Sequence, residues 1–129
     1  MKNLDYKKLV YNPQGEPYGF ILFPAKFGDD WEIPHHDKCL FIYFSNFEYI
    51  IDSIKKCYPI IYPDTNEVGE KFDVCSMNWI HNKAWNEIIS DLQSKSYEDV
   101  ELKNFVNDFC SWIIENQKDS DEIDVWGTL

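Results

Sequence analysis

Apolar residues recur with two different periods along this chain, and the change of period separates a strand-rich part from a helix-rich part. Almost continuously apolar runs over residues 18–23 and 39–44 predict two β-strands, the first of them covered on both faces. A third run, residues 6–12, is joined to the first by prolines and a glycine, which predicts a β-hairpin. Two further short strands are expected over residues 60–62 and 72–75.

The helical period begins after the second long apolar run. Ile50, Ile51 and Ile54 fall on one side of a helix and form an apolar stripe. Ser45 stands three residues before Glu48, which is the spacing of a capping box. The first helix is therefore expected to start at Ser45.

Two more helices and one ambiguous segment follow. A second helix is expected over residues 82–93, and a third after Ser96, whose spacing to Asp99 suits an N-cap. Beyond the third helix, the alternation of Ile123 and Val125 fits either a last strand or a tail that folds on a partner.

These elements predict an α+β fold in a single domain, residues 1–129. A small, mainly antiparallel sheet of about three to five strands is expected to pack against about three amphipathic helices. The domain divides into a strand-rich part (residues 1–75), a helix-rich part (residues 76–117) and an acidic C-terminal segment (residues 118–129).

Charge changes this picture, because it is unevenly distributed. The net charge is −11, from 23 acids and 12 lysines, with no arginine. Residues 1–60 hold 8 acids and 7 lysines (net −1), whereas residues 61–129 hold 15 acids and 5 lysines (net −10). Aromatic residues make up 17% of the chain, which is typical of a folded protein rather than a disordered one. We therefore expect a folded acidic surface that binds a positively charged partner.

The third helix is expected to carry part of this surface. At about 100° per residue, its acids fall opposite its apolar stripe, on a face without lysine, and the acidic surface is expected to continue into residues 119–124. Two tryptophans set among acids are candidate anchors for an interface. The candidate partner-binding residues are Trp31, Glu101, Asp108, Glu115, Asp121, Glu122, Asp124 and Trp126.

Candidate catalytic and metal-binding motifs are weak. The chain contains no P-loop, Gly-x-Ser-x-Gly or Gly-x-Gly-x-x-Gly sequence. In His35-His36-Asp37-x-Cys39, neighbouring side chains on an extended chain point to opposite sides, so they do not readily share an ion. The four cysteines lie in apolar stretches, which predicts buried, unreactive thiols rather than a nucleophile activated by His81. We expect no enzyme, no cofactor and no metal site.

The sequence also limits where the protein is expected to occur and which partners it is expected to bind. The N-terminal residues show no apolar core of a secretion signal, and the longest apolar runs are too short to span a bilayer. We expect a cytoplasmic protein. Its acidity disfavours direct binding to nucleic acid or to anionic membranes, since both would repel it. The sequence leaves the oligomeric state open.

In size, acidity, cytoplasmic character and aromatic richness, the whole chain resembles bacterial immunity proteins of contact-dependent growth inhibition and related polymorphic-toxin systems. This resemblance implies a non-enzymatic protein that binds and neutralises one cognate basic toxin domain. A nuclease is the expected toxin, because its active site must attract phosphate. The alternatives are a nucleic-acid mimic that inhibits a DNA-binding protein and an enzyme that acts on a cationic substrate.

Overall fold

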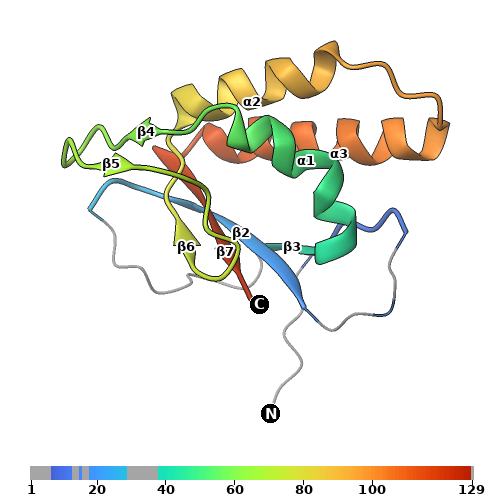
Figure 1. The fold of residues 1–129 in the computed structure, drawn as a ribbon, viewed down its shortest axis with the longest axis horizontal. Coiled ribbons are helices and arrows are strands. Elements are labelled where there is room, and N and C mark those ends of the chain that lie inside the picture. Colours follow the sequence, from blue (N-terminus) through green and yellow to red (C-terminus); the bar gives the residue numbers. More distant parts are fainter. Residues whose placement is uncertain (1–6, 13–14, 16–17, 29–37, 129) are drawn as a thin grey trace.

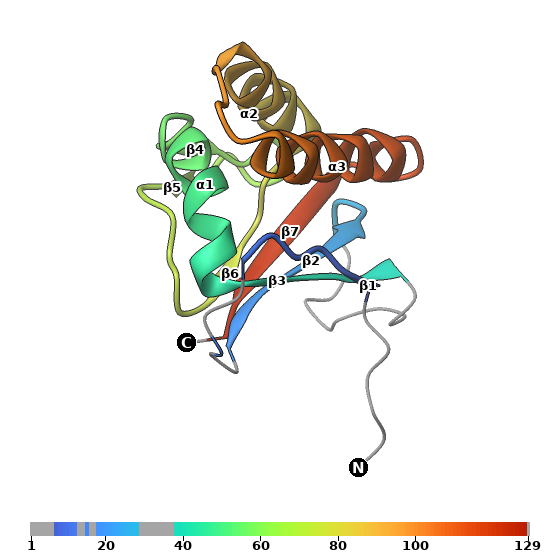
Figure 2. The same cartoon turned by 90° about the vertical axis from the view of Figure 1, so that its right-hand side faces the viewer.

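In the part of the chain that the structure describes, a five-stranded sheet carries three helices on one face, and residues 60–61 and 68–69 form a separate two-stranded hairpin (Figures 1 and 2). This computed structural model describes residues 7–12, 15, 18–28 and 38–128. In chain order the elements are β1 (Lys7–Lys8), β2 (Gly19–Ala25), β3 (Leu40–Tyr43), α1 (Phe44–Lys55), β4 (Ile60–Ile61), β5 (Val68–Gly69), β6 (Met77–Asn78), α2 (Asn82–Ser94), α3 (Val100–Gln117) and β7 (Glu122–Gly127).

The strand order β1-β3-β2-β7-β6 confirms the predicted α+β class with a mainly antiparallel sheet. Only the contact between β1 and β3 is parallel among the neighbouring strands of this described sheet. The predicted hairpin between the first two strands is wrong, because β3 lies between them. The apolar strand β3 occupies the inner position beside β2, whereas the exposed Lys7 and Lys8 lie on the outermost strand. Lysines at that position suit a sheet edge.

β2 is buried on both faces, as its continuous apolar run predicted. Phe20 and Leu22 belong to the large core beneath the helices, and neither has exposed surface. Ile21 and Phe23 point to the opposite side of the sheet, where they pack with Cys39 in a second apolar cluster. Because side chains alternate along the strand, β2 has one apolar core on each of its two sides.

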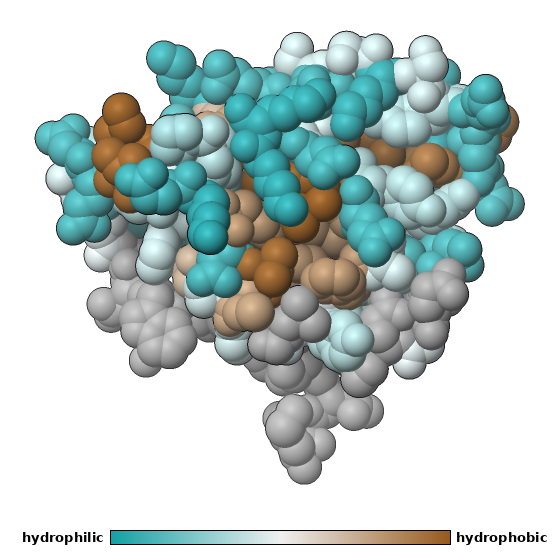
Figure 3. Space-filling view, in the orientation of Figure 1, coloured by the Kyte–Doolittle hydropathy of each residue, from teal (hydrophilic) through white to brown (hydrophobic). Residues whose placement is uncertain are grey.

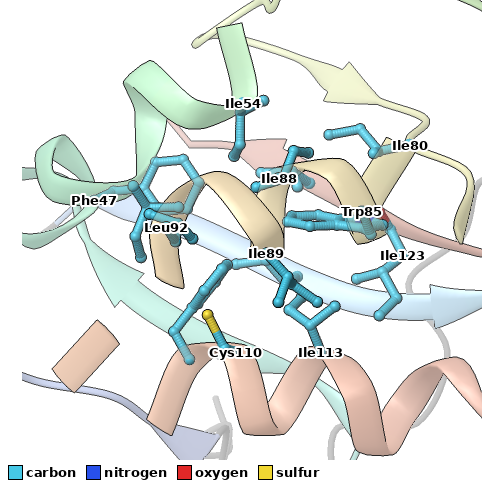
Figure 4. Packing of buried hydrophobic residues seen from close by; sticks show 14 of the residues in the cluster. Phe47, Ile54, Ile80, Trp85, Ile88, Ile89, Leu92, Cys110, Ile113 and Ile123 are labelled. Atoms are coloured by element: carbon cyan, nitrogen blue, oxygen red, sulfur yellow. Dashed lines mark hydrogen bonds between the residues drawn. The ribbon is translucent and has the colours of Figure 1, made fainter. Parts of the chain in front are cut away.

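The helices share one core against the sheet. Figure 4 shows Trp85 and Ile88 of α2 pointing into this core, with Ile113 of α3 and Ile123 of β7 close by. Trp85 has no exposed surface, and its indole Nε1–H donates to the backbone oxygen of Ile123 at 2.9 Å. Burial of these apolar faces, at about 25 cal/mol per Å², is the main stabilising contribution to the fold. None of the described helices is both long and apolar enough to cross a membrane.

Two helices start at residues other than those predicted. α1 begins at Phe44 with Tyr43 as its N-cap and without a capping side chain, so the capping box of Ser45 is not formed. β3 runs directly into this helix, which leaves no turn for a cap. α3 begins after Asp99, not Ser96, and the Asp99 carboxylate accepts the backbone N–H of Glu101 at 3.0 Å.

α2 starts at a histidine cap. Nδ1 of His81 accepts the backbone N–H of Ala84 at 3.1 Å. Burial lowers the pKa of His81 below its usual value of 6.5, and this effect outweighs the opposing charge of Glu87. The folded protein therefore holds a neutral imidazole that caps the helix.

We expect the free energy of unfolding to fall as the pH is lowered from about 7.5 to about 5.5. Below the usual pKa, the imidazole of the unfolded chain takes up a proton that the folded chain resists, because protonated Nδ1 cannot accept the Ala84 N–H. Urea denaturation at several pH values measures this dependence. The variant His81→Asn keeps a capping acceptor that does not titrate, so it should show a weaker pH dependence. An equal dependence in both proteins would assign the effect to other groups.

The C-terminal segment is a strand inside the sheet, which confirms the first of the two alternatives for this segment and excludes the tail. β7 lies between β2 and β6, and six residue pairs join it to β2. Ile123 and Val125 have no exposed surface. Gly127 allows the backbone of Val74 to approach closely, because a Cβ at residue 127 would overlap the Val74 carbonyl.

Residues 72–75 form a turn in place of the predicted strand. The buried Asn78 holds this turn, since its Oδ1 accepts the backbone N–H of Asp73 at 2.7 Å. Its Nδ2 donates to the backbone oxygens of Asp73 at 2.7 Å and of Val125 in β7 at 3.1 Å. One side chain thus attaches the turn and β6 to the centre of the sheet.

Candidate protein-binding site

The acids predicted on the third helix lie on its outer face. Glu101, Asp108 and Glu115 are all exposed, whereas Phe109 and Ile113 on the opposite side are buried. The helical periodicity of the sequence therefore correctly predicted that these three carboxylates are exposed.

Lysines from outside the helix offset this acidic face. Nζ of Lys118 lies 2.9 Å from a carboxylate oxygen of Glu115. Asp108 and Glu115 also line a groove of about 420 Å³, and Lys7 of β1 lines the same groove. Two of the three helix acids therefore lie near lysines that the helical projection did not include.

The acids of the C-terminal segment differ in exposure. Asp121 is exposed, and its Oδ2 accepts the backbone N–H of Phe27 at 3.0 Å, so it holds the residues that follow β2. Glu122 and Asp124 are only 7% and 3% exposed. The expectation that these acids continue the exposed surface of α3 is therefore wrong for Glu122 and Asp124. Side chains alternate along β7, so both point to the side of the sheet away from the helices.

Of the two candidate tryptophans, Trp126 is the one that the described residues include. Trp126 is half-buried and packs with Ile21 and Met77 in the apolar cluster on the second side of the sheet. Trp31 lies outside the described residues.

Two acidic segments distant in the sequence meet at one pocket. This acidic pocket has a volume of about 200 Å³ and lies where β2 ends, β7 begins and the turn after β4 folds back. Four carboxylates and one lysine line it, together with two aromatic side chains. These residues are Lys26, Tyr62, Asp64, Glu67, Trp79, Glu122 and Asp124.

The turn between β4 and β5 holds two of the four carboxylates. The backbone N–H of Tyr62 donates to the carbonyl of Glu67 at 2.8 Å, and the N–H of Asn66 donates to the carbonyl of Tyr62 at 2.8 Å. Asn66 has a φ of 61°, a left-handed conformation that asparagine adopts more readily than most residues. This closed turn sets the positions from which Asp64 and Glu67 reach the pocket.

Trp79 forms an aromatic wall of the pocket, and its neighbours fix its position. Asn78 is bonded to Val125 of β7, and the carbonyl of Ile80 accepts the backbone N–H of Ile123 at 2.9 Å. The backbone on both sides of Trp79 is therefore attached to the sheet. Its indole remains 41% exposed and contacts the ring of Tyr62 edge-on, with ring centroids 6.1 Å apart.

The acidic pocket has a negative electrostatic character. Burial raises the pKa of the Tyr62 hydroxyl, and the charges of Glu122, Glu67 and Asp124 raise it further. A field that opposes ionisation of a phenol favours a bound cation and disfavours an anion. A positive charge is therefore complementary to this pocket.

Sequence reasoning missed Tyr62, Asp64, Glu67 and Trp79 as candidate site residues. Asp64 and Glu67 contribute to the charge imbalance of residues 61–129, which was the only signal that included them. No local pattern connects them with β7, because that neighbourhood depends on the turn after β4 folding against the sheet.

The candidate metal-ligating and nucleophilic residues are only partly included in the described structure. No three His, Cys, Asp or Glu side chains gather there in a geometry suited to a metal ion. His35, His36 and Asp37 lie outside the described residues. Nδ1 of His81 is engaged in capping α2.

The expectation of four buried thiols is only partly met. Cys39 and Cys110 are buried, and Cys57 is partly buried. Cys75 is exposed, because it lies on the turn that replaced the predicted strand.

Comparison with known proteins provides no relative for this chain. It matches no protein-family model, no curated protein and no solved structure. The two candidate binding surfaces are therefore the acidic pocket and the outer face of α3.

Proposed function

We propose that this protein is an immunity protein that binds a basic toxin domain, a nuclease, and neutralises it without catalysing a reaction. The observation that carries this proposal is the acidic pocket, where carboxylates from two distant segments gather against one lysine. Complementary charge of this kind speeds and orients the docking of a basic protein.

The dimensions of the pocket support a protein partner. At about 200 Å³ it is smaller than the roughly 300–1,000 Å³ typical of sites for drug-sized ligands. One long side chain of a docked protein suits this volume. The half-exposed Trp79 beside it is of the residue type that most often dominates binding energy at protein interfaces.

A nucleic-acid mimic has weaker support. Such a mimic would present its acids in an exposed row, as α3 does with Glu101, Asp108 and Glu115. Lys118 is paired with one of these acids, and Lys7 lines a groove beside two of them. Four other carboxylates instead lie around a recess.

The test is to produce this chain together with the C-terminal domain of the protein encoded directly upstream of it. We expect that domain to arrest bacterial growth alone and this chain to restore growth. The purified pair should associate at least about ten-fold more slowly when the salt concentration rises from about 0.05 M to about 0.5 M, because screening shortens the range of the attraction. Arrest that persists in the presence of the chain, or an upstream domain without toxicity, would contradict the proposal.

Two double variants with the same change of charge locate the contact. Asp64→Lys/Glu67→Lys should slow association more than Asp108→Lys/Glu115→Lys, because the second pair already lies near lysines. All four side chains are exposed, so both variants should keep the fold. A larger effect of the helix pair would place the interface on α3.

A further inference from the structure

We propose that the acidic pocket is a binding site for an arginine side chain of the partner, whose guanidinium stacks on Trp79 and faces the surrounding carboxylates. This inference rests on the proposed function only in assuming that the arginine belongs to a protein partner. The pocket itself can be tested without that partner.

The shape and composition of the pocket suit a guanidinium. It combines a recess of about 200 Å³ with a tryptophan wall and four carboxylates. A guanidinium is planar and stays charged, it stacks on aromatic faces, and it binds carboxylates through two parallel hydrogen bonds. A lysine ammonium is a more strongly hydrated point charge and uses the aromatic wall less well.

The aromatic wall of the pocket is preorganised. Asn78 and Ile80, on either side of Trp79, are each hydrogen-bonded to β7, and the ring of Tyr62 lies nearly perpendicular to the indole. A wall that is already in place costs less ordering entropy when a guest binds. The side chain of Trp79 is accessible, since 41% of its surface is exposed.

The side of the β4–β5 hairpin that faces the pocket differs in composition from its outer side. Ile61 of β4 and Val68 of β5 pair directly across this hairpin and are 61% and 50% exposed. Side chains alternate along a strand, so they point away from Tyr62 and Glu67. Figure 3 shows hydrophobic surface at the end of the molecule that holds β4 and β5. The acids and the aromatic wall thus gather on one side, and Ile61 serves as a control on the other.

The experiment is an NMR titration of the ¹⁵N-labelled protein with Nα-acetyl-arginine amide. Nα-acetyl-citrulline amide, which has nearly the same shape but no charge, is the control ligand. We expect saturable shifts of the Trp79 indole N–H signal, assigned by its loss in Trp79→Phe. The arginine compound should bind at least about ten-fold more tightly than the citrulline compound, which corresponds to about 1.4 kcal/mol.

Two variants test whether the arginine compound binds in the acidic pocket. Asp64→Asn/Glu67→Gln should raise the Kd for the arginine compound by about five- to ten-fold, as expected for lost hydrogen bonds to a charged group. Ile61→Ser, on the outer side of the same hairpin, should leave the Kd unchanged. Equal binding of the citrulline compound, or no saturable shift at Trp79, would overturn the inference.

This outcome is separate from that of the proposed function. Neutralisation of the upstream toxin without binding of the arginine compound would retain the immunity role and reject the arginine site. Binding of the arginine compound without neutralisation of the toxin would retain the arginine site and reject the immunity role.

Discussion

Removal of residues 122–129 is expected to abolish the fold, although these residues stand at the very end of the chain. The deletion takes away β7, which separates β2 from β6 in the sheet. It also removes Ile123 and Val125 from the core and leaves the backbone groups of β2 without their partners. Unsatisfied backbone groups and an opened core together should exceed the roughly 5–15 kcal/mol that stabilises a typical domain.

Circular dichroism and thermal melting of the shortened chain measure this effect, with loss of a cooperative transition as the expected result. The variant Asp119→Asn is a control, because it alters the charge of the same segment at an exposed position ahead of the strand. It should change the free energy of unfolding by no more than about 0.5 kcal/mol. A cooperative transition in the shortened chain would show that β7 is dispensable.

Replacement of Trp85 by alanine is expected to be the most destabilising single substitution among the aromatic residues of the helices. Trp85 is completely buried, and truncation of a buried tryptophan costs about 3–5 kcal/mol. The carbonyl of Ile123 would lose its indole donor as well, which adds about 1–3 kcal/mol if that oxygen stays buried. The ring also lies 6.0 Å from that of Phe109, so the cavity would extend towards α3.

Urea denaturation of three variants separates these contributions. Trp85→Phe keeps much of the volume and loses the hydrogen bond, so it should cost clearly less than Trp85→Ala. Phe109→Ala should cost about 3–5 kcal/mol, since its ring is also fully buried. Trp112→Ala should cost less than either alanine variant, because Trp112 lies at the edge of the core and is only partly buried. A larger effect at Trp112 than at Trp85 would place the centre of the core elsewhere.

Much of the secondary structure follows from local patterns in the sequence. The apolar run at residues 18–23 predicted a strand with two covered faces, and β2 has them. The apolar faces of all three helices were also evident, because the residues of one helix face recur every three to four positions whatever the helix packs against. The starts of α1 and α3 were less evident, since Ser45 and Ser96 match a capping pattern that the adjoining chain does not use.

Strand order depends on contacts that no local pattern encodes. Residues 6–12 were expected to pair with β2, but β3 forms that pair instead and β1 lies beside β3. Several strands of similar apolar character compete for the same neighbour, and the arrangement that buries most apolar surface is selected by the whole chain. The C-terminal strand shows the same limit, because Ile123 and Val125 have a strand pattern but their place depends on β2.

For the candidate site as well, some features were predictable from the sequence and others depended on the fold. Local patterns predicted the helices, the main strands and the exposure of Glu101 and Asp108, and the composition showed the excess of acid in residues 61–129, because each of these depends on composition or on the period of one element. That Asp64 and Asp124 share a pocket with Trp79 followed from none of these patterns and became evident in the folded chain. Charge is a property of each residue, but a site is a property of distances between segments, and those distances exist only once β7 has entered the sheet and the turn after β4 has folded against it.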